Sequence, residues 1–335
     1  MPLSRRALLS TAGATAVLAA VSPTAAARPR TGSPVRRIPL QGAVNVRDLG
    51  GRPTLGGGRV RHGLVYRGDH LAKLTDADLT VLGGLGLARA VDFRIPTEVA
   101  HDGADRLPAG VAAVSRPVTD RGLFGQLMAA IGSRDPVRQE EMLGGGRAAA
   151  YMTEVYRTFV TDAANRARFG RTLRELAEPG TGPVLYHCTS GKDRTGWTSW
   201  LLLRLVGVPE RFATEDYLAS NTFRAAYDAR VREGLREGGL MRDPELIVPL
   251  QEVRGEYLDA SLAEVAAGYG SLYRYATAGL GLDPRTLAGL RRRLVVGGGA
   301  GGPPPPPPAA PPPRPGGAPP PGGAGPPGGA RGGAP

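Results

Sequence analysis

The chain has 335 residues, which is enough for one domain of about 250 residues with appendages. Its single cysteine excludes an intramolecular disulfide framework and a multi-cysteine zinc site. The formal net charge of +12 fits either a merely cationic surface or attraction to anionic lipid headgroups and phosphorylated substrates. Because no basic stripe with interleaved aromatic residues is present, we expect no nucleic-acid binding.

Residues 1–27 have the pattern of an export signal. The pair Arg5-Arg6 precedes a run of small apolar residues, and Ala25-Ala26-Ala27 offers a cleavage site. The paired arginines resemble a twin-arginine signal, although a general secretory signal also begins with positive charge. The apolar run is too short for a permanent membrane span. We therefore predict an exported protein, with a linker at 28–35 and a globular domain at 36–296.

The first segment of the domain is polar and turn-forming. In Asn45–Gly51, two glycines precede a predicted hairpin formed by Arg59–His62 and Leu64–Asp69. Two roles stay open for Arg47 and Asp48. They either form a structural ion pair that holds a turn or support a nearby ligand pocket.

The apolar segment 88–93 predicts a strand that ends at Asp92. A carboxylate at the exit of a central strand in an α/β sheet points toward the ligand crevice. Asp92 could pair with Arg94 or Arg47 in a structural or orienting role, or it could act as an acid. A short strand is expected at 115–118.

Apolar periodicity predicts several helices around these strands. Thr75 precedes a capped helix with acidic residues in its first turn. The amphipathic stretch 122–132 is expected to pack on the core or to lie as a lid over a cleft. Two core helices are expected within 148–177 and two more within 252–293.

The segment from Val184 to Gly196 predicts a buried strand, a polar loop and the start of a helix. The loop contains Cys188 and Arg194 in the spacing Cys-x5-Arg. Amides that converge at a helix N-terminus bind anions, and Gly191 permits the required turn. A helix N-terminus and a nearby cation also favour the thiolate form of a cysteine. Arg194 can grip two phosphate oxygens, so Cys188 could attack phosphorus and form a phosphocysteine.

The string His187–Gly196, HCTSGKDRTG, resembles the signature of cysteine-dependent tyrosine phosphatases. It looks like the branch of bacterial secreted tyrosine/serine phosphatases, some of which act on phosphoinositides. Asn45–Gly51, the D-x-R-x-x-x-E pattern that starts at Asp92, and Glu215–Asn221 resemble further motifs of that family. Gly68 departs from it, because the family usually has serine there. The resemblance covers about residues 36–294. It implies an α/β, three-layer cysteine-dependent phosphatase fold with a central, mostly parallel sheet flanked by helices.

The chemistry and the resemblance together assign roles to the loop. Cys188 is the predicted nucleophile and Arg194 stabilises the phosphoryl group, with Asp193 as the first candidate for the general acid and Asp92 as the second. Thr195 could donate to the departing sulfur. The residues expected to bind phosphate are Thr189, Ser190, Gly191, Lys192, Arg194 and Thr195.

Two loop residues keep alternative interpretations. Lys192 either adds a charge that favours phosphoinositides or is a solvated side chain at the rim. His187 either tunes the thiolate through hydrogen bonds or is only the last residue of the strand. Arg47 and Asp48 complete the predicted supporting set. No metal or other cofactor is expected, because none of the four histidines has ligand spacing with another.

The sequence predicts an exported, monomeric phosphatase of phosphotyrosine and phosphoserine proteins, with phosphoinositides as a further substrate class. Contact with an anionic membrane is expected to be peripheral. One alternative is an inositol polyphosphate hydrolase, and another is a phospho-ligand binding module without turnover. Residues 297–335 are almost only glycine, proline and alanine, so we expect a disordered tail. A third alternative is an envelope-binding protein in which that tail is the functional part.

Overall fold

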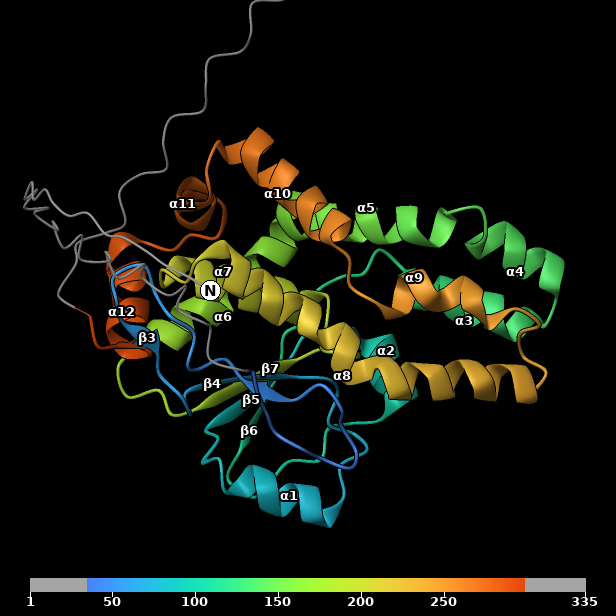
Figure 1. The fold of residues 1–335 in the computed structure, drawn as a ribbon, viewed down its shortest axis with the longest axis horizontal. Helices are drawn as coiled ribbons and strands as arrows, with labels where there is room; N and C mark the ends of the chain where they lie inside the picture. The colour runs from blue at the N-terminus through green and yellow to red at the C-terminus, as the bar shows by residue number, and fades with distance from the viewer. Residues whose placement is uncertain (1–34, 299–335) are drawn as a thin grey trace, which may run out of the picture.

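The computed structural model describes residues 35–298 (Figure 1). The predicted export signal, nearly all of the predicted linker and the predicted tail from residue 299 onward lie outside the described residues. At the centre is a six-stranded sheet in the order β1-β2-β4-β7-β5-β6. The strands β4, β7, β5 and β6 run parallel, and β1 and β2 are antiparallel at one edge. The bounds of these strands are Arg36–Arg37 (β1), Arg47–Asp48 (β2), Val65–Gly68 (β4), Arg89–Asp92 (β5), Ala112–Ser115 (β6) and Val184–His187 (β7).

The sheet separates two hydrophobic cores. Along β7, Val184 and Tyr186 join the larger core, whereas Leu185 between them joins the smaller one. Along β5, Val91 and Ala90 divide in the same way. Successive side chains of a strand point to opposite faces, so an apolar run without alternation marks a strand covered on both sides. The fold is therefore three-layered, and the predicted α/β class with a mostly parallel sheet is confirmed.

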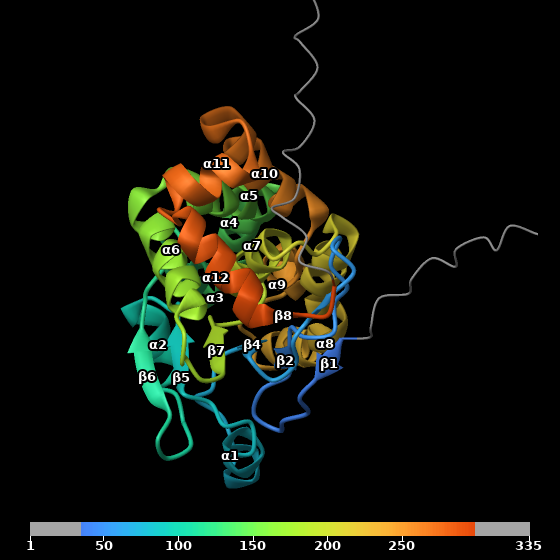
Figure 2. The same ribbon diagram turned by 90° about the vertical axis from the view of Figure 1, so that its left-hand side faces the viewer.

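Helices cover both faces of the sheet (Figure 2). On the smaller-core side lies α1 (Asp76–Gly83), whose first turn is closed by a capping box between Thr75 and Asp78. Most of the remaining helices lie on the opposite side. Their bounds are Pro96–Asp102 (α2), Leu123–Ser133 (α3), Pro136–Leu143 (α4), Arg147–Thr161 (α5), Ala163–Ala177 (α6), Arg194–Leu205 (α7), Glu210–Glu237 (α8), Val248–Gln251 (α9), Gly255–Tyr269 (α10), Leu272–Arg274 (α11) and Pro284–Leu294 (α12), with a 3-10 turn at Pro244–Ile247 and a π turn at Tyr275–Gly279.

The predicted hairpin is wrong. Its first segment forms β3 (Arg59–Val60), which pairs with β8 (Val295–Val296) in a separate two-stranded sheet. The second segment forms β4, which lies in the main sheet between β2 and β7. The reason is burial, because the side chains of β4 are buried throughout and need covering on both faces. A hairpin with the half-exposed β3 could not supply that cover.

The position of one strand also differs from the prediction. The Glu215–Asn221 motif lies within α8, a single helix of 28 residues. The strand expected at 115–118 is displaced, because β6 covers Ala112–Ser115 and shares only Ser115 with the expected range. The helices expected after Thr75, at 122–132 and within 148–177 are confirmed. Among the helices that the structure describes, none is long and apolar enough to cross a membrane.

Candidate active site

The predicted loop lies at the carboxyl end of β7, in the middle of the sheet. β7 is flanked by β4 and β5, so the loop opens where three parallel strands end. Gly191 has a φ of +65°, and a Cβ at this position would lie 2.3 Å from the carbonyl oxygen of Gly68. The loop is therefore packed directly on the backbone that follows β4. Only glycine satisfies both the left-handed conformation and the close approach.

Three successive backbone carbonyl groups of the loop accept hydrogen bonds from residues outside the loop. The amide of His70 donates to Thr189 O at 3.2 Å. The Asn45 side-chain amide donates to Ser190 O at 3.0 Å, and Arg67 Nη2 donates to Gly191 O at 2.7 Å. Within the described part of the chain, the backbone amides of residues 189–193 donate to no other group. Carbonyls held outward with amides left available make a concave anion-binding nest.

A buried ionic network fixes the donors behind the loop. Asp216 on α8 binds Arg67 Nη1 at 2.7 Å through one carboxylate oxygen and Arg47 Nε at 3.0 Å through the other. Arg47 also donates to the side-chain oxygen of Asn45. Burial disfavours the Asp216 carboxylate, but the two arginines outweigh it and lower the pKa of Asp216 to about 2. Burial, together with the neighbouring Arg67, lowers the pKa of Arg47 to about 10.

This network distinguishes the two residues whose roles were left open. Arg47 supports the loop through Asn45 and Asp216. Asp48 instead accepts hydrogen bonds from the amides of Gly50 and Gly63 and approaches the ring of His62 at 3.1 Å. It holds the turn before β4 and belongs to the structural alternative. Its placement in the supporting set of the loop is therefore corrected.

Arg194 is held by a carboxylate that the sequence analysis did not assign to the site. Glu98 accepts from Arg194 Nη1 at 2.6 Å and from Nη2 at 2.5 Å, and it also accepts from the Thr189 hydroxyl at 2.6 Å. Burial disfavours the charged forms of both Glu98 and Arg194. The pair nevertheless lowers the pKa of Glu98 and, together with the charge on Cys188, raises that of Arg194 well above its usual value. The available signal was the final residue of the D-x-R-x-x-x-E pattern, in the first turn of α2.

A cavity of about 100 Å³ lies over the loop. Its polar side contains four loop residues that were predicted to bind phosphate, together with Asp193, Glu98 and Asp120. Its other side is apolar and comes from α3, α5 and α9, so the predicted amphipathic helix at 122–132 contributes to this wall. The apolar lining residues are Leu123, Phe124, Leu127, Met152, Val155, Phe159 and Leu250.

The structure separates the two candidates for the general acid. Asp193 lines the cavity, and it accepts from Lys192 Nζ at 2.8 Å and from the Tyr156 hydroxyl at 3.0 Å. Asp92 is not among the lining residues. Its carboxylate is bound by Arg94, with Nη2 at 2.9 Å and Nε at 3.1 Å. This geometry favours the orienting role for Asp92 and leaves Asp193 as the carboxylate beside the cavity.

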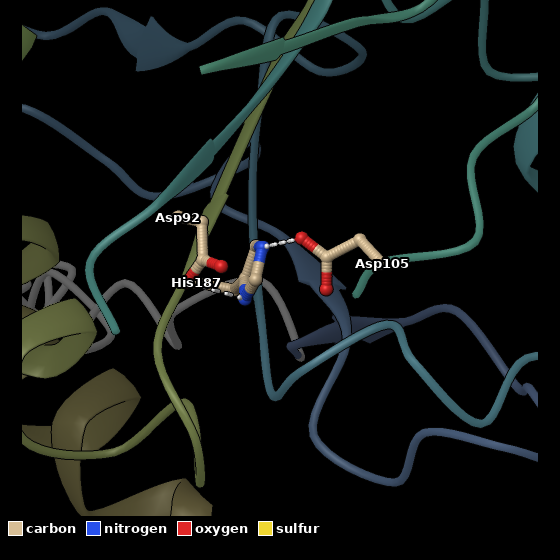
Figure 3. A group of neighbouring side chains, drawn as sticks. All are labelled: Asp92, Asp105 and His187. Carbon is tan, nitrogen blue, oxygen red and sulfur yellow. Dashed lines mark ion pairs between the residues drawn. The ribbon is translucent and has the colours of Figure 1, made fainter. Parts of the chain in front are cut away.

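His187 lies in a buried cluster behind the loop (Figure 3). Its Nε2 atom is 2.8 Å from Asp105 and its Nδ1 atom is 3.7 Å from Asp92. Two carboxylates and an imidazole have the composition of a metal site. Arg94, however, donates to both carboxylates and already supplies the cation. Burial lowers the pKa of His187, but the bond to Asp105 outweighs this and raises it overall.

The remaining loop residues lie as follows. Cys188 is a free, buried cysteine directly after β7. Lys192 is 1% exposed and binds Asp193 and the carbonyl of Glu252, so the solvated alternative for this residue is wrong. Thr195 is buried at the start of α7, and its hydroxyl has no hydrogen-bond partner among the described residues. A fixed arginine and a carboxylate thus line the cavity beside an anion-binding nest, and a buried thiol lies at the start of the same loop, although it is not among the lining residues. Phosphoryl-transfer enzymes use this combination of groups.

A family model and two relatives by sequence agree with this class. The model of the tyrosine phosphatase family matches residues 38–296. A putative tyrosine-protein phosphatase of Cupriavidus necator is 36% identical over 246 residues, covering 73% of this chain and 84% of the relative. The triple specificity protein phosphatase PtpB of Mycobacterium tuberculosis is 31% identical over 262 residues, covering 72% of this chain and 92% of PtpB. A crystal structure of TpbA from P. aeruginosa aligns with 71% of this chain and 99% of its own, at 19% identity and a TM-score of 0.26.

The chain belongs to the tyrosine phosphatase family. It is a protein-tyrosine phosphatase, a hydrolase of phosphoric monoesters. The family expected from the HCTSGKDRTG string is thereby confirmed. The secreted branch and its phosphoinositide activity stay predictions.

Proposed function

We propose that this protein is an exported phosphatase that acts through a phosphocysteine intermediate on phosphotyrosine and phosphoserine in proteins, and on phosphoinositides. The observation that carries the proposal is the arrangement of the loop. Cys188 and Arg194 stand at its two ends, its amides are available to an anion, and Glu98 locks the arginine fork. A phosphoryl group seated there meets the sulfur and the guanidinium together.

The reaction would proceed in two displacements. The thiolate of Cys188 attacks phosphorus, and the P–S bond forms as the ester P–O bond breaks. Asp193, protonated at that moment, gives its proton to the leaving oxygen. Water then attacks the phosphocysteine and gives a proton back to Asp193. Inorganic phosphate leaves as the P–S bond breaks, and the Thr195 hydroxyl can donate to the departing sulfur.

The cavity supports substrates that carry an apolar or aromatic group next to the phosphate. Residues of α3, α5 and α9 form an apolar wall directly beside the loop. The ring of phosphotyrosine or the glycerolipid part of a phosphoinositide would bury apolar surface there. The name of the PtpB relative, which credits it with triple specificity, supports more than one substrate class. A soluble inositol polyphosphate would leave this wall unused, which places that alternative second.

Location and assembly are part of the proposal. Export rests on the pattern of residues 1–27, and peripheral contact with anionic membranes rests on the net charge of +12. We propose that the enzyme acts as a monomer. Expression of the full-length chain in a bacterium, followed by detection of a cleaved chain outside the cytoplasm, tests export. Retention of an uncleaved chain in the cytoplasm would refute it.

The proposed activity is tested with Cys188→Ser and a panel of substrates. The variant is expected to lose turnover of phosphotyrosine peptides while still binding inorganic phosphate in calorimetry. Full activity in the variant would refute the mechanism, and binding without turnover in the wild type would establish the alternative of a binding module. Phosphoserine peptides, phosphoinositide vesicles and inositol hexakisphosphate extend the panel. A preference for the last of these would establish the inositol polyphosphate alternative.

A further inference from the structure

Two buried tyrosines form a hydrogen-bonded chain that ends at the proposed general acid. The hydroxyl of Tyr156, on α5, donates to Asp193 Oδ1 at 3.0 Å. The hydroxyl of Tyr217, on α8, donates to that of Tyr156 at 2.8 Å. Neither tyrosine is exposed to solvent. The chain thus reaches Asp193 from the protein interior, on the side away from solvent.

Packing alone does not require a hydroxyl at position 156. Phe159 lies one turn further along α5, is equally buried and contacts the ring of Tyr156 at 4.9 Å between centroids. A buried phenol hydroxyl costs free energy unless it is bonded. The hydroxyl of Tyr156 is bonded to Asp193, the proposed general acid, which lines the cavity together with Glu98 and Asp120. Burial is the larger cause and the charge of Asp193 the next, and together they raise the pKa of Tyr156 well above its usual value. The hydroxyl of Tyr156 therefore remains a donor at neutral pH.

The other hydrogen-bond partner of Asp193 is Lys192, whose ammonium group can also be attracted by a bound anion. Lys192 Nζ lies 2.8 Å from both carboxylate oxygens, and the side chain of Lys192 also lines the cavity. A bound phosphate dianion would compete for this ammonium group, because Lys192 lines the same cavity and two negative charges attract a cation more strongly than the single charge of a carboxylate. Tyr156 is neutral and has no such competitor. It therefore remains the restraint on Asp193 when the substrate is bound.

We propose that Tyr156 is a positioning residue for the general acid Asp193. Its hydroxyl holds one carboxylate oxygen while the other carries the proton to the leaving group. This inference rests on the proposed function, and in particular on Asp193 as the acid. It assigns a role to α5 beyond its part in the apolar wall.

The test compares leaving groups in the full-length chain. Phenyl phosphate has a poor leaving group that needs an acid, whereas 2,4-dinitrophenyl phosphate needs almost none. Tyr156→Phe removes only the hydroxyl. We expect kcat/KM on phenyl phosphate to fall about tenfold, a part of the 10²–10⁴-fold that general acids contribute. On 2,4-dinitrophenyl phosphate kcat/KM should stay within about twofold, because this parameter covers only the steps up to departure of the leaving group and excludes hydrolysis of the phosphocysteine.

Tyr275→Phe is the matched control. It removes another fully buried phenol hydroxyl, which donates to Phe159 O at 3.2 Å and does not contact the loop. Both kcat/KM values should stay within about twofold in this variant. The ratio of kcat/KM on the two substrates does not depend on the fraction of folded enzyme. A loss of stability in Tyr156→Phe therefore cannot imitate the expected result.

The outcomes distinguish a failure of the proposed function from a failure of the role proposed for Tyr156. If wild type does not turn over either aryl phosphate, the proposed function fails. If wild type is active and Asp193→Asn lowers the rate selectively on phenyl phosphate, the result for Tyr156→Phe decides this inference alone. An unchanged ratio of kcat/KM values in Tyr156→Phe, or a similar change in Tyr275→Phe, would overturn it. Equal loss on both substrates in Asp193→Asn would overturn it as well.

Discussion

The two sides of the phosphate-binding loop are built from different interactions. Behind the loop, Arg47, Arg67 and Asp216 are fully or almost fully buried and bind one another through ion pairs. In front of it, α3 contributes an apolar wall whose side chains are only partly buried, and Ala130 is its single buried residue. The comparison suggests that the shape of the loop is fixed by charge pairs. The α3 part of the side that meets the substrate can therefore vary with little effect on stability, unlike the α5 part, whose lining residues Met152, Val155 and Phe159 belong to the core.

The back of the loop depends on residues from separate parts of the chain. Arg47 and Arg67 lie opposite each other on the neighbouring strands β2 and β4. Asp216 and Ser220 are four residues apart on α8 and so face the same side of that helix. Ser220 accepts from Arg47 at 3.0 Å. Because each charge is satisfied by another part of the network, loss of one member leaves the others unpaired.

The largest expected effect follows from Asp216→Asn. Removal of this carboxylate charge leaves two buried arginines without their shared counter-ion, which typically costs about 3–5 kcal/mol. The free energy of unfolding, measured by urea denaturation, should fall by that amount, and activity should fall with it. Glu210→Gln is the control on the same helix, where an exposed carboxylate lies 3.7 Å from Arg204. It should cost no more than about 1 kcal/mol, and equal losses would contradict the comparison.

A second prediction concerns the pH dependence of the same pair. The pKa of Asp216 falls from 3.8 to about 2 on folding, so the folded state binds this proton less tightly than the unfolded state. Its stabilising contribution is therefore present above about pH 4 and is lost as the pH falls through about 2. The stability difference between wild type and Asp216→Asn should shrink between pH 5 and pH 2. A difference that stays constant over this range would show that the carboxylate charge is not responsible.

The sequence predicted the parts of the site that lie close together along the chain. Cys188, Gly191 and Arg194 belong to one loop, so their spacing alone indicated the anion nest. Asp193 and Asp92 could not be ranked in this way, because the choice depends on which carboxylate faces the cavity. The structure makes that choice by binding Asp92 to Arg94 and leaving Asp193 beside the loop.

The long-range supports were beyond local patterns. Glu98 is the last residue of the D-x-R-x-x-x-E pattern, but no local sequence pattern indicates that its side chain binds Arg194. The burial of Lys192 could not be predicted either, because a lysine between glycine and aspartate is typical of a solvent-exposed loop. The hairpin prediction failed because local turn signals do not say which strand is covered on both faces. The fold class followed from the resemblance of the HCTSGKDRTG string to one family, and the apolar strands without alternation agree with a sheet covered on both sides.

A third prediction tests the ion pair between Glu98 and Arg194 at the phosphate-binding loop. Glu98→Gln keeps the shape of the side chain but removes the charge that orients the Arg194 fork. Charged hydrogen bonds contribute about 1.5–3 kcal/mol, so kcat/KM for an aryl phosphate should fall at least tenfold. Glu175→Gln serves as a control, because its arginine partners, Arg89, Arg116 and Arg171, are not among the residues that line the cavity. Unchanged kcat/KM in Glu98→Gln would show that the backbone carbonyls bound by Arg194 suffice to hold it.

The smallest effect is expected at the apolar wall. Leu127→Ala removes part of a half-buried side chain from α3, which corresponds to about 1 kcal/mol of apolar contact with a bound ring. KM for phenyl phosphate should therefore rise about fivefold, whereas KM for glycerol phosphate and the thermal melting temperature should change little. Val137→Ala on the neighbouring α4, 67% exposed and outside the cavity lining, is the control and should leave both KM values unchanged. If Leu127→Ala instead destabilised the protein as strongly as Asp216→Asn, the front wall would be part of the framework. Substrate preference could then not be altered there independently of the fold.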